Sequence, residues 1–524
     1  MTFRHAVLPL ALMLACGSTS ALAARGFEVR DLATLDRVSS PTLSPDGRRV
    51  VFAKRVVDLA ANKSSTALWI EDLMARDAAP PVRLTPEGWN VNSPAFSPDG
   101  KTVYFLSGKS GSMQLYAIAA SGGTPKQLTA FATDVGAYRI SPDGKRVAFN
   151  TEAFTDCGND LGCSKKRIDD RAAQKNSGVV HDRIFIRHWD TWANGTLNRL
   201  FVAALPADGK TVNTATLVSG GVNGDVPSKP FGDSSEYTWA PDGKSLVFSA
   251  RISDAKEPTS TNFDLYQVNA DGTGSAKNLT PANPAWDTGA TFAADGKTLY
   301  YRAMKRPGFE ADRFGLMAMD LASGKAREIA PKWDRSADGI TLSADGKTIL
   351  TPATDMGEHP LFAVDIATGE VKKLVGEGSV SAIDLAGPTL AITRNSLKSG
   401  DVLYTTSADA SAPLRAITAT TGDTLKDVAF GDFEQFNFKG WNGDTVHGYV
   451  VKPWNYVEGQ KYPVAFLIHG GPQGSFGNGW SYRWNPQTYA GQGYAVVMID
   501  FHGSTGYGQA FTDAISQHWG DRPL

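Results

Sequence analysis

The sequence predicts two architectures in series: an all-β propeller of seven blades, and after it a shorter segment in which parallel strands and helices alternate. Three observations support this fold class. A turn motif ending in Asp-Gly recurs at a period of about 50 residues, and a strand of similar pattern follows each hairpin. Near the C-terminus, two apolar runs are each followed by a glycine-rich loop, which is typical of buried parallel strands.

A secretory signal peptide is predicted over residues 1–23. A short basic start precedes an apolar run from Ala6 to Ala15, and the small residues Ala21 to Ala23 follow, so we expect cleavage after Ala23. The protein is therefore expected to be secreted or periplasmic. A lipoprotein modified at Cys16 is an alternative interpretation of the same region, and a buried N-terminal helix is another.

Residues 27–37 predict a short amphipathic helix that leads into the propeller, which we place at residues 38–421. Each Asp-Gly supplies the positive φ of a tight hairpin turn, so each motif marks two paired strands. The motif occurs at Ser44-Pro45-Asp46-Gly47, Ser97-Pro98-Asp99-Gly100, Ser141-Pro142-Asp143-Gly144, Ala240-Pro241-Asp242-Gly243, Ala293-Ala294-Asp295-Gly296 and Ser343-Ala344-Asp345-Gly346.

A second recurring element gives the number of blades. Seven segments carry a Leu followed by an aromatic or aliphatic residue: Leu68-Trp69, Leu115-Tyr116, Leu200-Phe201, Leu265-Tyr266, Leu316-Met317, Leu361-Phe362 and Leu403-Tyr404. Four strands per repeat at this period indicate a β-propeller, with a β-sandwich or a β-solenoid as the alternative. The seventh blade lacks its Asp-Gly, and the long step from Asp143 to Asp242 predicts an insertion over 151–198 in the third blade.

The insertion is the least regular part of the propeller and contains two candidate features. Cys157 and Cys163 are predicted to form a disulfide, because two nearby thiols in an oxidising compartment are most simply paired. A strand over 184–189 would place Phe185, Arg187 and Trp189 on one face. Arg187 and Trp189 are the candidate substrate-binding residues, but stacking of the arginine within the blade is the favoured role, because arginine–aromatic stacking is common at sheet surfaces.

Composition excludes several classes of function. The chain has 52 basic and 54 acidic residues and a formal charge of −2, which gives no reason to expect binding to nucleic acid or to an anionic membrane. No run after residue 25 is apolar enough to span a bilayer. His181 and His188 stand near the cysteines at no recognised zinc spacing, so we expect neither a metal nor a cofactor. The oligomeric state is left open.

The C-terminal segment predicts a strand, loop, helix and strand in that order. The apolar runs Pro463–Ile468 and Ala495–Ile499 are candidate parallel strands, with a short helix over Pro486–Gly491 between them. The first run leads into His469-Gly470-Gly471-Pro472, and the second into Gly503-Ser504-Thr505-Gly506-Tyr507-Gly508. Two further strands, Glu434–Lys439 and Val446–Lys452, precede this unit as an antiparallel pair.

These two loops and the final stretch QAFTDAISQHWGDRPL resemble the prolyl oligopeptidase family of serine peptidases, in its dipeptidyl-peptidase V and acylaminoacyl-peptidase branch. The resemblance implies that residues 429–524 are the N-terminal part of an α/β-hydrolase domain. It further implies an exported serine peptidase that acts on short peptide substrates and releases N-terminal dipeptides or acylated residues. The chemistry would be Ser-His-Asp acyl transfer.

Within this resemblance, Gly471 is the candidate oxyanion-hole residue, since its backbone N–H would face the developing negative charge. His469 is expected to hydrogen-bond within its own loop, and Asp500 is not expected to be the triad acid. The sequence contains no Gly-x-Ser-x-Gly, so no catalytic residue is assigned in this chain, and the Ser, Asp and His are expected beyond Leu524. On this expectation, residues 1–524 alone would be inactive.

A function of another class competes with the peptidase. The missing nucleophile favours a non-catalytic periplasmic propeller, similar to TolB, that binds a protein partner. The retained HGGP and GSTGYG loops favour the peptidase, because a binding module has no physical need for them.

Overall fold

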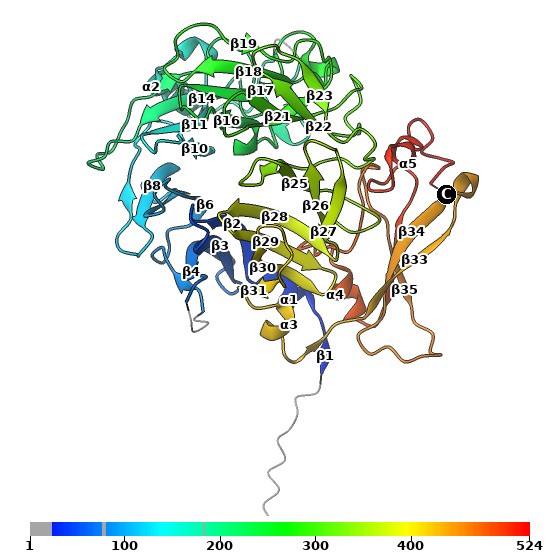
Figure 1. Ribbon diagram of the computed structural model, residues 1–524. Coiled ribbons are helices and arrows are strands. Elements are labelled where there is room, and N and C mark those ends of the chain that lie inside the picture. The colour runs from blue at the N-terminus through cyan, green and yellow to red at the C-terminus, as the bar shows by residue number, and fades with distance from the viewer. Residues whose placement is uncertain (1–23, 76–79, 182–183, 524) are drawn as a thin grey trace, which may run out of the picture.

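The computed structural model describes residues 24–75, 80–181 and 184–523. Seven four-stranded antiparallel sheets form a ring, and an eighth four-stranded sheet from the C-terminal segment lies beside it (Figure 1). The predicted fold class, an all-β propeller of seven blades followed by the first part of an α/β-hydrolase domain, is confirmed. The signal peptide predicted over residues 1–23, together with Ala23 and Cys16, lies outside the described residues.

The first four blades take their strands in chain order. Blade 1 is β2 (Arg37–Leu43), β3 (Arg49–Asp58), β4 (Lys63–Asp72) and β5 (Val82–Arg83), and blade 2 is β6 (Val91–Phe96), β7 (Thr102–Ser107), β8 (Gln114–Ala119) and β9 (Lys126–Gln127). Blade 3 is β10 (Tyr138–Ile140), β11 (Arg146–Ala153), β14 (Leu197–Ala204) and β15 (Thr216–Leu217), and blade 4 is β16 (Tyr237–Trp239), β17 (Ser245–Ala250), β18 (Asp264–Asn269) and β19 (Lys277–Asn278).

The remaining three blades repeat this order. Blade 5 is β20 (Asp287–Phe292), β21 (Thr298–Ala303), β22 (Gly315–Asp320) and β23 (Ala326–Glu328), and blade 6 is β24 (Thr341–Leu342), β25 (Thr348–Pro352), β26 (Leu361–Asp365) and β27 (Val371–Val375). Blade 7 is β28 (Ser379–Ala386), β29 (Thr389–Ser396), β30 (Ser399–Ser407) and β31 (Arg415–Ala416).

The recurring turn motif folds through contacts within its own few residues. In blade 1 the Ser44 hydroxyl donates to Asp46 Oδ1 at 2.6 Å, and the Gly47 N–H donates to the Ser44 carbonyl at 2.7 Å. Gly47 has φ +69°, a conformation that a residue with a Cβ rarely adopts. The Arg49 N–H then donates to the Ser44 hydroxyl, which fixes the start of the next strand.

Each of blades 7 and 1 is built from consecutive strands, so no strand from one end of the propeller completes the blade at the other end. Side-chain contacts between the two blades therefore close the ring. Leu43 donates its N–H to Asp384 at 2.6 Å, and the Thr389 hydroxyl donates to the Gly47 carbonyl at 2.8 Å. Val38, Leu43 and Phe52 of blade 1 pack in one apolar cluster with residues of blade 7 such as Leu403. Hydrophobic packing and a few polar contacts therefore hold the two ends of the propeller together.

The chain enters beside the point where it leaves the propeller. Strand β1 (Arg25–Gly26) pairs in parallel with β32 (Val428–Ala429), and the short helix α3 (Thr421–Thr424) precedes β32. Helix α1 (Val29–Thr34) lies within the predicted lead-in helix of residues 27–37 but is shorter. Its Leu32 packs with Phe27 in a small core that also contacts the C-terminal segment.

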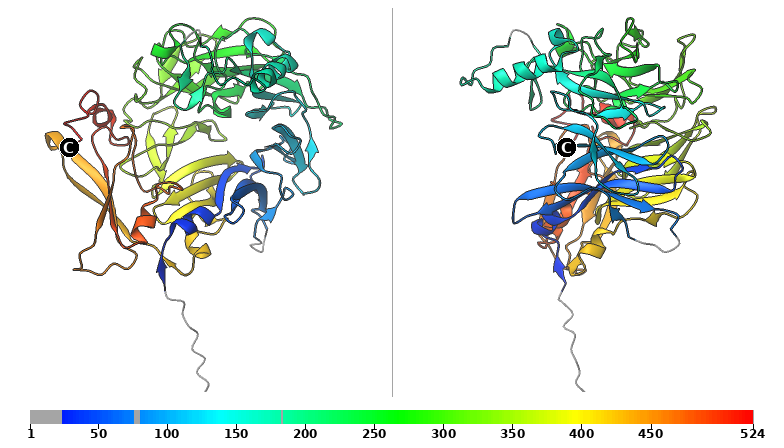
Figure 2. Two further views of the ribbon diagram at one scale, coloured as in Figure 1. Left: turned by 180° about the vertical axis from the view of Figure 1, so that it is seen from behind. Right: turned by 90° about the vertical axis from the view of Figure 1, so that its left-hand side faces the viewer.

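Between β11 and β14 the insertion projects from blade 3 (Figure 2). It contains the 3₁₀ turn η1 (Thr155–Cys157), helix α2 (Leu161–Ala172) and a small hairpin of β12 (Arg187–His188) and β13 (Thr191–Trp192). A disulfide joins Cys157 to Cys163 across the start of α2. The rest of the propeller carries two more 3₁₀ turns, η2 (Ser234–Glu236) and η3 (Glu257–Thr259).

The C-terminal sheet has the order β33, β34, β36 and β35. Its strands are β33 (Phe433–Lys439), β34 (Thr445–Val451), β35 (Val464–Leu467) and β36 (Ala495–Asp500), with the turn η4 (Trp441–Gly443) and helices α4 (Pro486–Ala490) and α5 (Gln509–Asp513). Strand β36 runs antiparallel to β34 and parallel to β35. One side of the β35 region is open to solvent: Val464, Phe466 and Ile468 are 60, 53 and 69% exposed.

Candidate active site

The loop that follows β35 presents a backbone donor. Gly471 has φ +135°, and its peptide bond to Pro472 is cis. A glycine is needed here because a Cβ on residue 471 would lie 2.6 Å from the Gln473 nitrogen. Gly471 is solvent-exposed, and no acceptor in the described part of the chain takes a hydrogen bond from its N–H. This N–H is therefore free to bind an oxygen of a ligand.

His469 lies in the same loop and is engaged within the segment. A hydrogen bond of 2.9 Å joins its Nε2 to Ser504 Oγ, and another of 2.9 Å joins its Nδ1 to the Gly470 carbonyl. The ring stacks on Phe501 with centroids 4.4 Å apart, and the side chain is 8% exposed. His469 thus connects the HGGP loop to the loop that follows β36, as expected for a structural hydrogen-bonder.

Asp500 completes a constellation of Ser, His and Asp that lacks triad geometry. Its Oδ1 lies 3.7 Å from His469 Nε2, the same nitrogen that contacts Ser504, whereas a triad uses opposite ring nitrogens. Ser504 is 0% exposed, so a substrate carbonyl has no access to it. Asp500 instead accepts hydrogen bonds from Ser475 at 2.5 Å and Tyr507 at 2.7 Å. It braces both loops.

The C-terminal segment rests on the propeller through specific polar contacts. The Tyr449 hydroxyl donates to Glu358 at 3.2 Å, and Asn478 donates to the same carboxylate at 3.2 Å. Burial and the adjacent Glu358 raise the pKa of Tyr449 above its usual value. The Met356 N–H donates to the Gly506 carbonyl at 3.0 Å. The connection between β25 and β26 therefore positions the loop after β36.

Blade 5 supplies a second point of attachment. Arg306 forms a two-pronged ion pair with Asp513 of α5, with nitrogen–oxygen distances of 2.9 and 2.7 Å. The same guanidinium contacts Asp312 at 3.0 Å, and together the two carboxylates hold the pKa of Arg306 above its usual value. Gln509 also donates to the Ala311 carbonyl at 3.0 Å. Helix α5 is thereby fixed against the loop between β21 and β22.

A polar cavity of about 320 Å³ lies between these attachments. The propeller lines it with Arg302, Arg313 and Phe314 of blade 5 and with residues of the connection to blade 6, among them Asp334 and Arg335. The C-terminal segment lines it with Gln473, Thr505, Gly506, Gly508, Gln509 and Thr512. Because Gln473 is two residues from Gly471, the cavity adjoins the loop that carries the free N–H.

The insertion hairpin differs from its prediction. The strand covers Arg187–His188 only, and Trp189 has φ +52° at the turn, so the prediction of a strand over 184–189 was wrong. Phe185, Arg187 and Trp189 consequently do not share one face. Arg187 lies 5.4 Å over the Trp192 ring, and the Trp189 ring is 5.8 Å from that of Phe231. The turn lets Trp189 reach the blade 3–4 connection, a contact that alternation does not predict.

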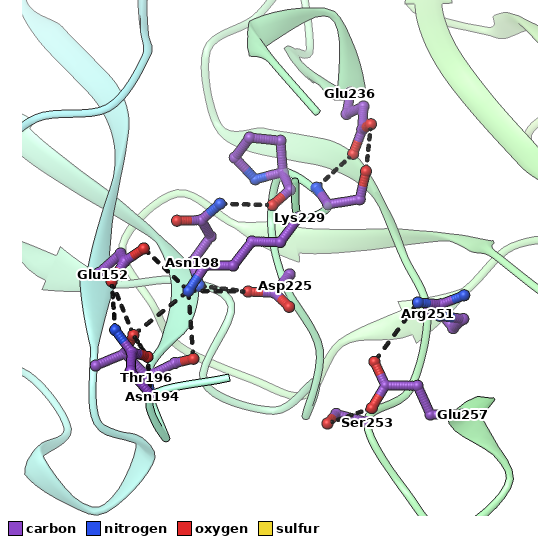
Figure 3. A network of polar contacts seen from close by, with 12 residues as sticks. Glu152, Asn194, Thr196, Asn198, Asp225, Lys229, Glu236, Arg251, Ser253 and Glu257 are labelled. Carbon is purple, nitrogen blue, oxygen red and sulfur yellow. Dashed lines mark hydrogen bonds and ion pairs between the residues drawn. The ribbon is translucent and has the colours of Figure 1, made fainter. Parts of the chain in front are cut away.

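Figure 3 shows a polar network that ties the end of this insertion to the connection between blades 3 and 4. Lys229 Nζ lies 3.1 Å from Glu152 and 3.9 Å from Asp225, and it donates to the Thr196 carbonyl at 3.3 Å. Burial raises the pKa of Asp225 to about 6. The Asn198 N–H donates to Asp225 at 2.6 Å. The network therefore positions the segment that carries Phe231 beside the hairpin.

The candidate residues occupy different parts of the molecule. Gly471 lies in the C-terminal segment, whereas Arg187 and Trp189 lie on the blade 3 insertion. Within the described ranges, neither hairpin residue stacks on or hydrogen-bonds to the HGGP loop. The cavity residue Arg302 was absent from the sequence prediction. No group of three side chains suited to a metal ion occurs in the described ranges, and none of the helices described there is long and apolar enough to cross a membrane.

Comparison with family models gives two matches. The model described as TolB beta propeller domain matches residues 30–174, and the model described as Prolyl oligopeptidase family matches residues 480–524. The dipeptidyl-peptidase 5 of Porphyromonas gingivalis is 30% identical over 494 residues, which are 94% of this chain and 70% of that protein. A dipeptidyl-peptidase 5 of Aspergillus fumigatus is 34% identical over 374 residues, and this match covers 67% of the chain and about half, 51%, of that relative.

Solved structures share the architecture at low sequence identity. An acylaminoacyl peptidase in complex with Z-Gly-Gly-Phe-chloromethyl ketone aligns with a TM-score of 0.74 and 18% identity, covering 95% of this chain and 70% of that one. A puromycin-hydrolyzing peptidase of Mycobacterium tuberculosis aligns with a TM-score of 0.66 and 17% identity, covering 96% and 72%. These structures carry the same succession of propeller and hydrolase sheet.

Proposed function

The chain belongs to the prolyl oligopeptidase family, and from this premise we propose that it is part of an exported serine peptidase that cleaves short peptides. The proposed products are N-terminal dipeptides or acylated residues, since its relatives are named dipeptidyl-peptidase 5 and its structural neighbours include acylaminoacyl peptidases. Export is proposed from the signal peptide predicted over residues 1–23.

The observation that carries the proposal is the free, exposed N–H of Gly471 beside a polar cavity. In acyl transfer, a serine attacks the substrate carbonyl, a histidine takes the serine proton, and negative charge forms on the carbonyl oxygen. A preorganised N–H donor stabilises that oxygen more than it stabilises the uncharged carbonyl. We assign this role to Gly471. No nucleophile is assigned within residues 1–524, because the sequence has no Gly-x-Ser-x-Gly.

Arg187 and Trp189 are proposed to contact the substrate from the propeller. Trp189 is 68% exposed, and Arg187 stands on the adjacent strand of the same hairpin. The insertion joins β11 to β14 and so emerges at the same end of its blade as the β21–β22 and β25–β26 connections, which contact the C-terminal segment. The contribution of Arg187 and Trp189 would appear in KM, because contacts made equally with the substrate and with the transition state do not raise kcat.

The proposal is tested with the protein as its host produces it. The substrates are dipeptidyl p-nitroanilides with free N-termini, which test release of dipeptides, and the same compounds N-acetylated, which test release of acylated residues. The protein should hydrolyse at least one of the two sets. Gly471→Ala keeps the backbone N–H but should displace it, because the new Cβ at φ +135° would lie 2.6 Å from the Gln473 nitrogen. We expect kcat to fall by up to about 10²- to 10³-fold, the usual effect when an oxyanion donor no longer contributes. Gly470→Ala is the matched control, because a Cβ on residue 470 has nothing within 4 Å. Equal kcat values for the two variants would contradict the role of Gly471.

A second candidate function follows from the TolB beta propeller match over residues 30–174. In this alternative the propeller binds a protein partner without chemistry, as propellers often do. Stoichiometric binding of peptides with no turnover by the host-produced protein would favour the binding function and reject the peptidase. Sustained turnover abolished by a serine-directed fluorophosphonate would favour the peptidase.

A further inference from the structure

The cavity between blade 5 and the C-terminal segment contains one half-buried arginine, Arg302, without a carboxylate in direct contact. Arg302 sits near the end of β21, and burial lowers the pKa of its guanidinium. In the described ranges its hydrogen bonding is limited to Nη1, which donates to the Ala337 carbonyl at 3.1 Å. Its Nε is buried without any acceptor. Nε lies against Gly289, so the donors left for a ligand in the cavity are the remaining N–H groups of Nη1 and Nη2.

The other cations of the cavity are neutralised. Arg313 contacts Glu328 at 2.5 Å, and Arg335 contacts Asp355 at 2.8 Å. Arg302 has no carboxylate oxygen within 4.0 Å among the described residues. Removing a charge from water is unfavourable without a direct ion pair, and the more distant carboxylates of Asp338, Glu236 and Asp233 offset this cost only in part, since the pKa of Arg302 is still lowered. Arg302 thus differs from its two neighbours in lacking a partner.

None of the acidic residues that line the cavity forms an ion pair with Arg302. Asp312 is paired with an arginine outside the cavity lining, and Asp338 lies 2.6 Å from a ring nitrogen of His359. Asp334 accepts the Gln509 N–H at 3.1 Å, and Glu310 is exposed to solvent. These four carboxylates line the cavity, and their negative charge disfavours a multiply charged anion such as phosphate more than a singly charged one. A single carboxylate is the anion that fits one guanidinium in this setting.

Two neighbours hold the guanidinium in place. Its carbon lies 5.0 Å from the Phe314 ring centroid, which restricts the plane of the group by stacking. On the strand beside it, a Cβ at Gly289 would come within 2.9 Å of Arg302 Nε, so the glycine leaves the space that this side-chain conformation occupies. The guanidinium is consequently preorganised, and little side-chain entropy is lost when a ligand binds.

We propose that Arg302 binds a carboxylate group of a short peptide in the cavity between blade 5 and the loops at Gln473 and Thr505. The carboxylate is either the C-terminus of the peptide or an acidic side chain, and Arg302 would take it with two parallel N–H bonds. The inference concerns binding alone. It holds whether or not the chain belongs to an active peptidase, so its test does not depend on turnover.

The test is isothermal titration of the protein with matched pairs of probes. The first pair is Ala-Ala-Ala and its C-terminal amide, and the second is N-acetyl-Ala-Glu-Ala-amide and the Gln equivalent. The wild type should bind at least one acid about tenfold more tightly than its uncharged counterpart. Preference in the first pair identifies the C-terminus as the source of the carboxylate, and preference in the second identifies the side chain.

Arg302→Met should abolish that preference. Arg327→Met is the matched control, since Arg327 is in the same blade and donates to the Ile366 carbonyl away from the cavity. If Arg302→Met does not fold, Arg302→Lys replaces it; a single ammonium should reduce the preference about threefold. The proposal is overturned if the wild type does not distinguish acid from amide, if the Arg302 variants retain the full preference, or if inorganic phosphate displaces the probes better than acetate does.

Discussion

Replacing Asp225 by Asn should stabilise the protein above neutral pH. Burial raises the pKa of this carboxyl from 3.8 to about 6, so the fold disfavours its charged form. A difference of about two pKa units corresponds to about 3 kcal/mol. We expect a gain of about 1–2 kcal/mol for Asp225→Asn, because the amide keeps a carbonyl oxygen for the Asn198 N–H but is itself polar and buried. Lys229 would still have an ion-pair partner in the variant, because Glu152 lies 3.1 Å from its Nζ.

The size of the effect depends on pH. A raised pKa means that the folded state binds the proton more tightly than the unfolded state, so this group favours folding most below pH 3.8. That contribution is lost as pH rises through about 6. Urea unfolding followed by tryptophan fluorescence should therefore show a large gain for Asp225→Asn at pH 8 and little gain at pH 4. Asp208→Asn, in an exposed loop, is the control and should show no such gain. A variant less stable than wild type at pH 8, or an equal difference at both pH values, would refute the reasoning.

Three further predictions concern particular contacts. The double variant Cys157→Ser, Cys163→Ser should lose about 2 kcal/mol of the free energy of unfolding, the value for a disulfide that closes a short loop. Limited proteolysis of this variant should cut near α2 before other sites. Arg306→Met should cost at most about 1 kcal/mol because the Arg306 side chain is 42% exposed. Hydrogen exchange should nevertheless become faster in α5, and unchanged exchange there would contradict the attachment through Asp513. Gly503→Ala should lower the thermal midpoint by several degrees, since φ is +108° and the new Cβ would lie 2.7 Å from Ile515; Gly493→Ala, with positive φ but open space, separates the clash from the backbone strain.

The blades could be predicted because their determinants are local. The turn at Ser44 is held by hydrogen bonds that span no more than five residues, so the motif carries its own structure wherever it occurs. Blade 7 lacks the motif and still forms, with Gly387 at φ +53° between β28 and β29. In that blade the turn residue changed while the strand pattern around Leu403 persisted, which is why counting strands gave the correct number.

The site could be predicted only in part, because its geometry depends on residues far apart in the chain. Gly471 stood out through the local HGGP pattern. Arg302 did not, because it lines one cavity with Thr505 and Gln509 only through the packing of the C-terminal segment on blade 5. Alternation of the sequence assigned Trp189 to a strand. In the structure Trp189 stands at a turn with positive φ, and from there its ring contacts Phe231 in the connection between blades 3 and 4. Sequence periodicity describes one helix or strand at a time and contains no information on contacts between elements far apart in the chain.

The order of strands within a blade explains why these features share one side of the ring. Strands alternate in direction, so the loop after the second strand and the connection to the next blade emerge at the same end. The insertion after β11, Arg306 after β21, and Glu358 after β25 all follow second strands, and the last two contact the C-terminal segment directly. The Asp-Gly turns follow first strands and lie at the opposite end. Substitutions in those turns should therefore change stability and leave ligand binding unaltered, whereas the loops after second strands can change binding without loss of the blade.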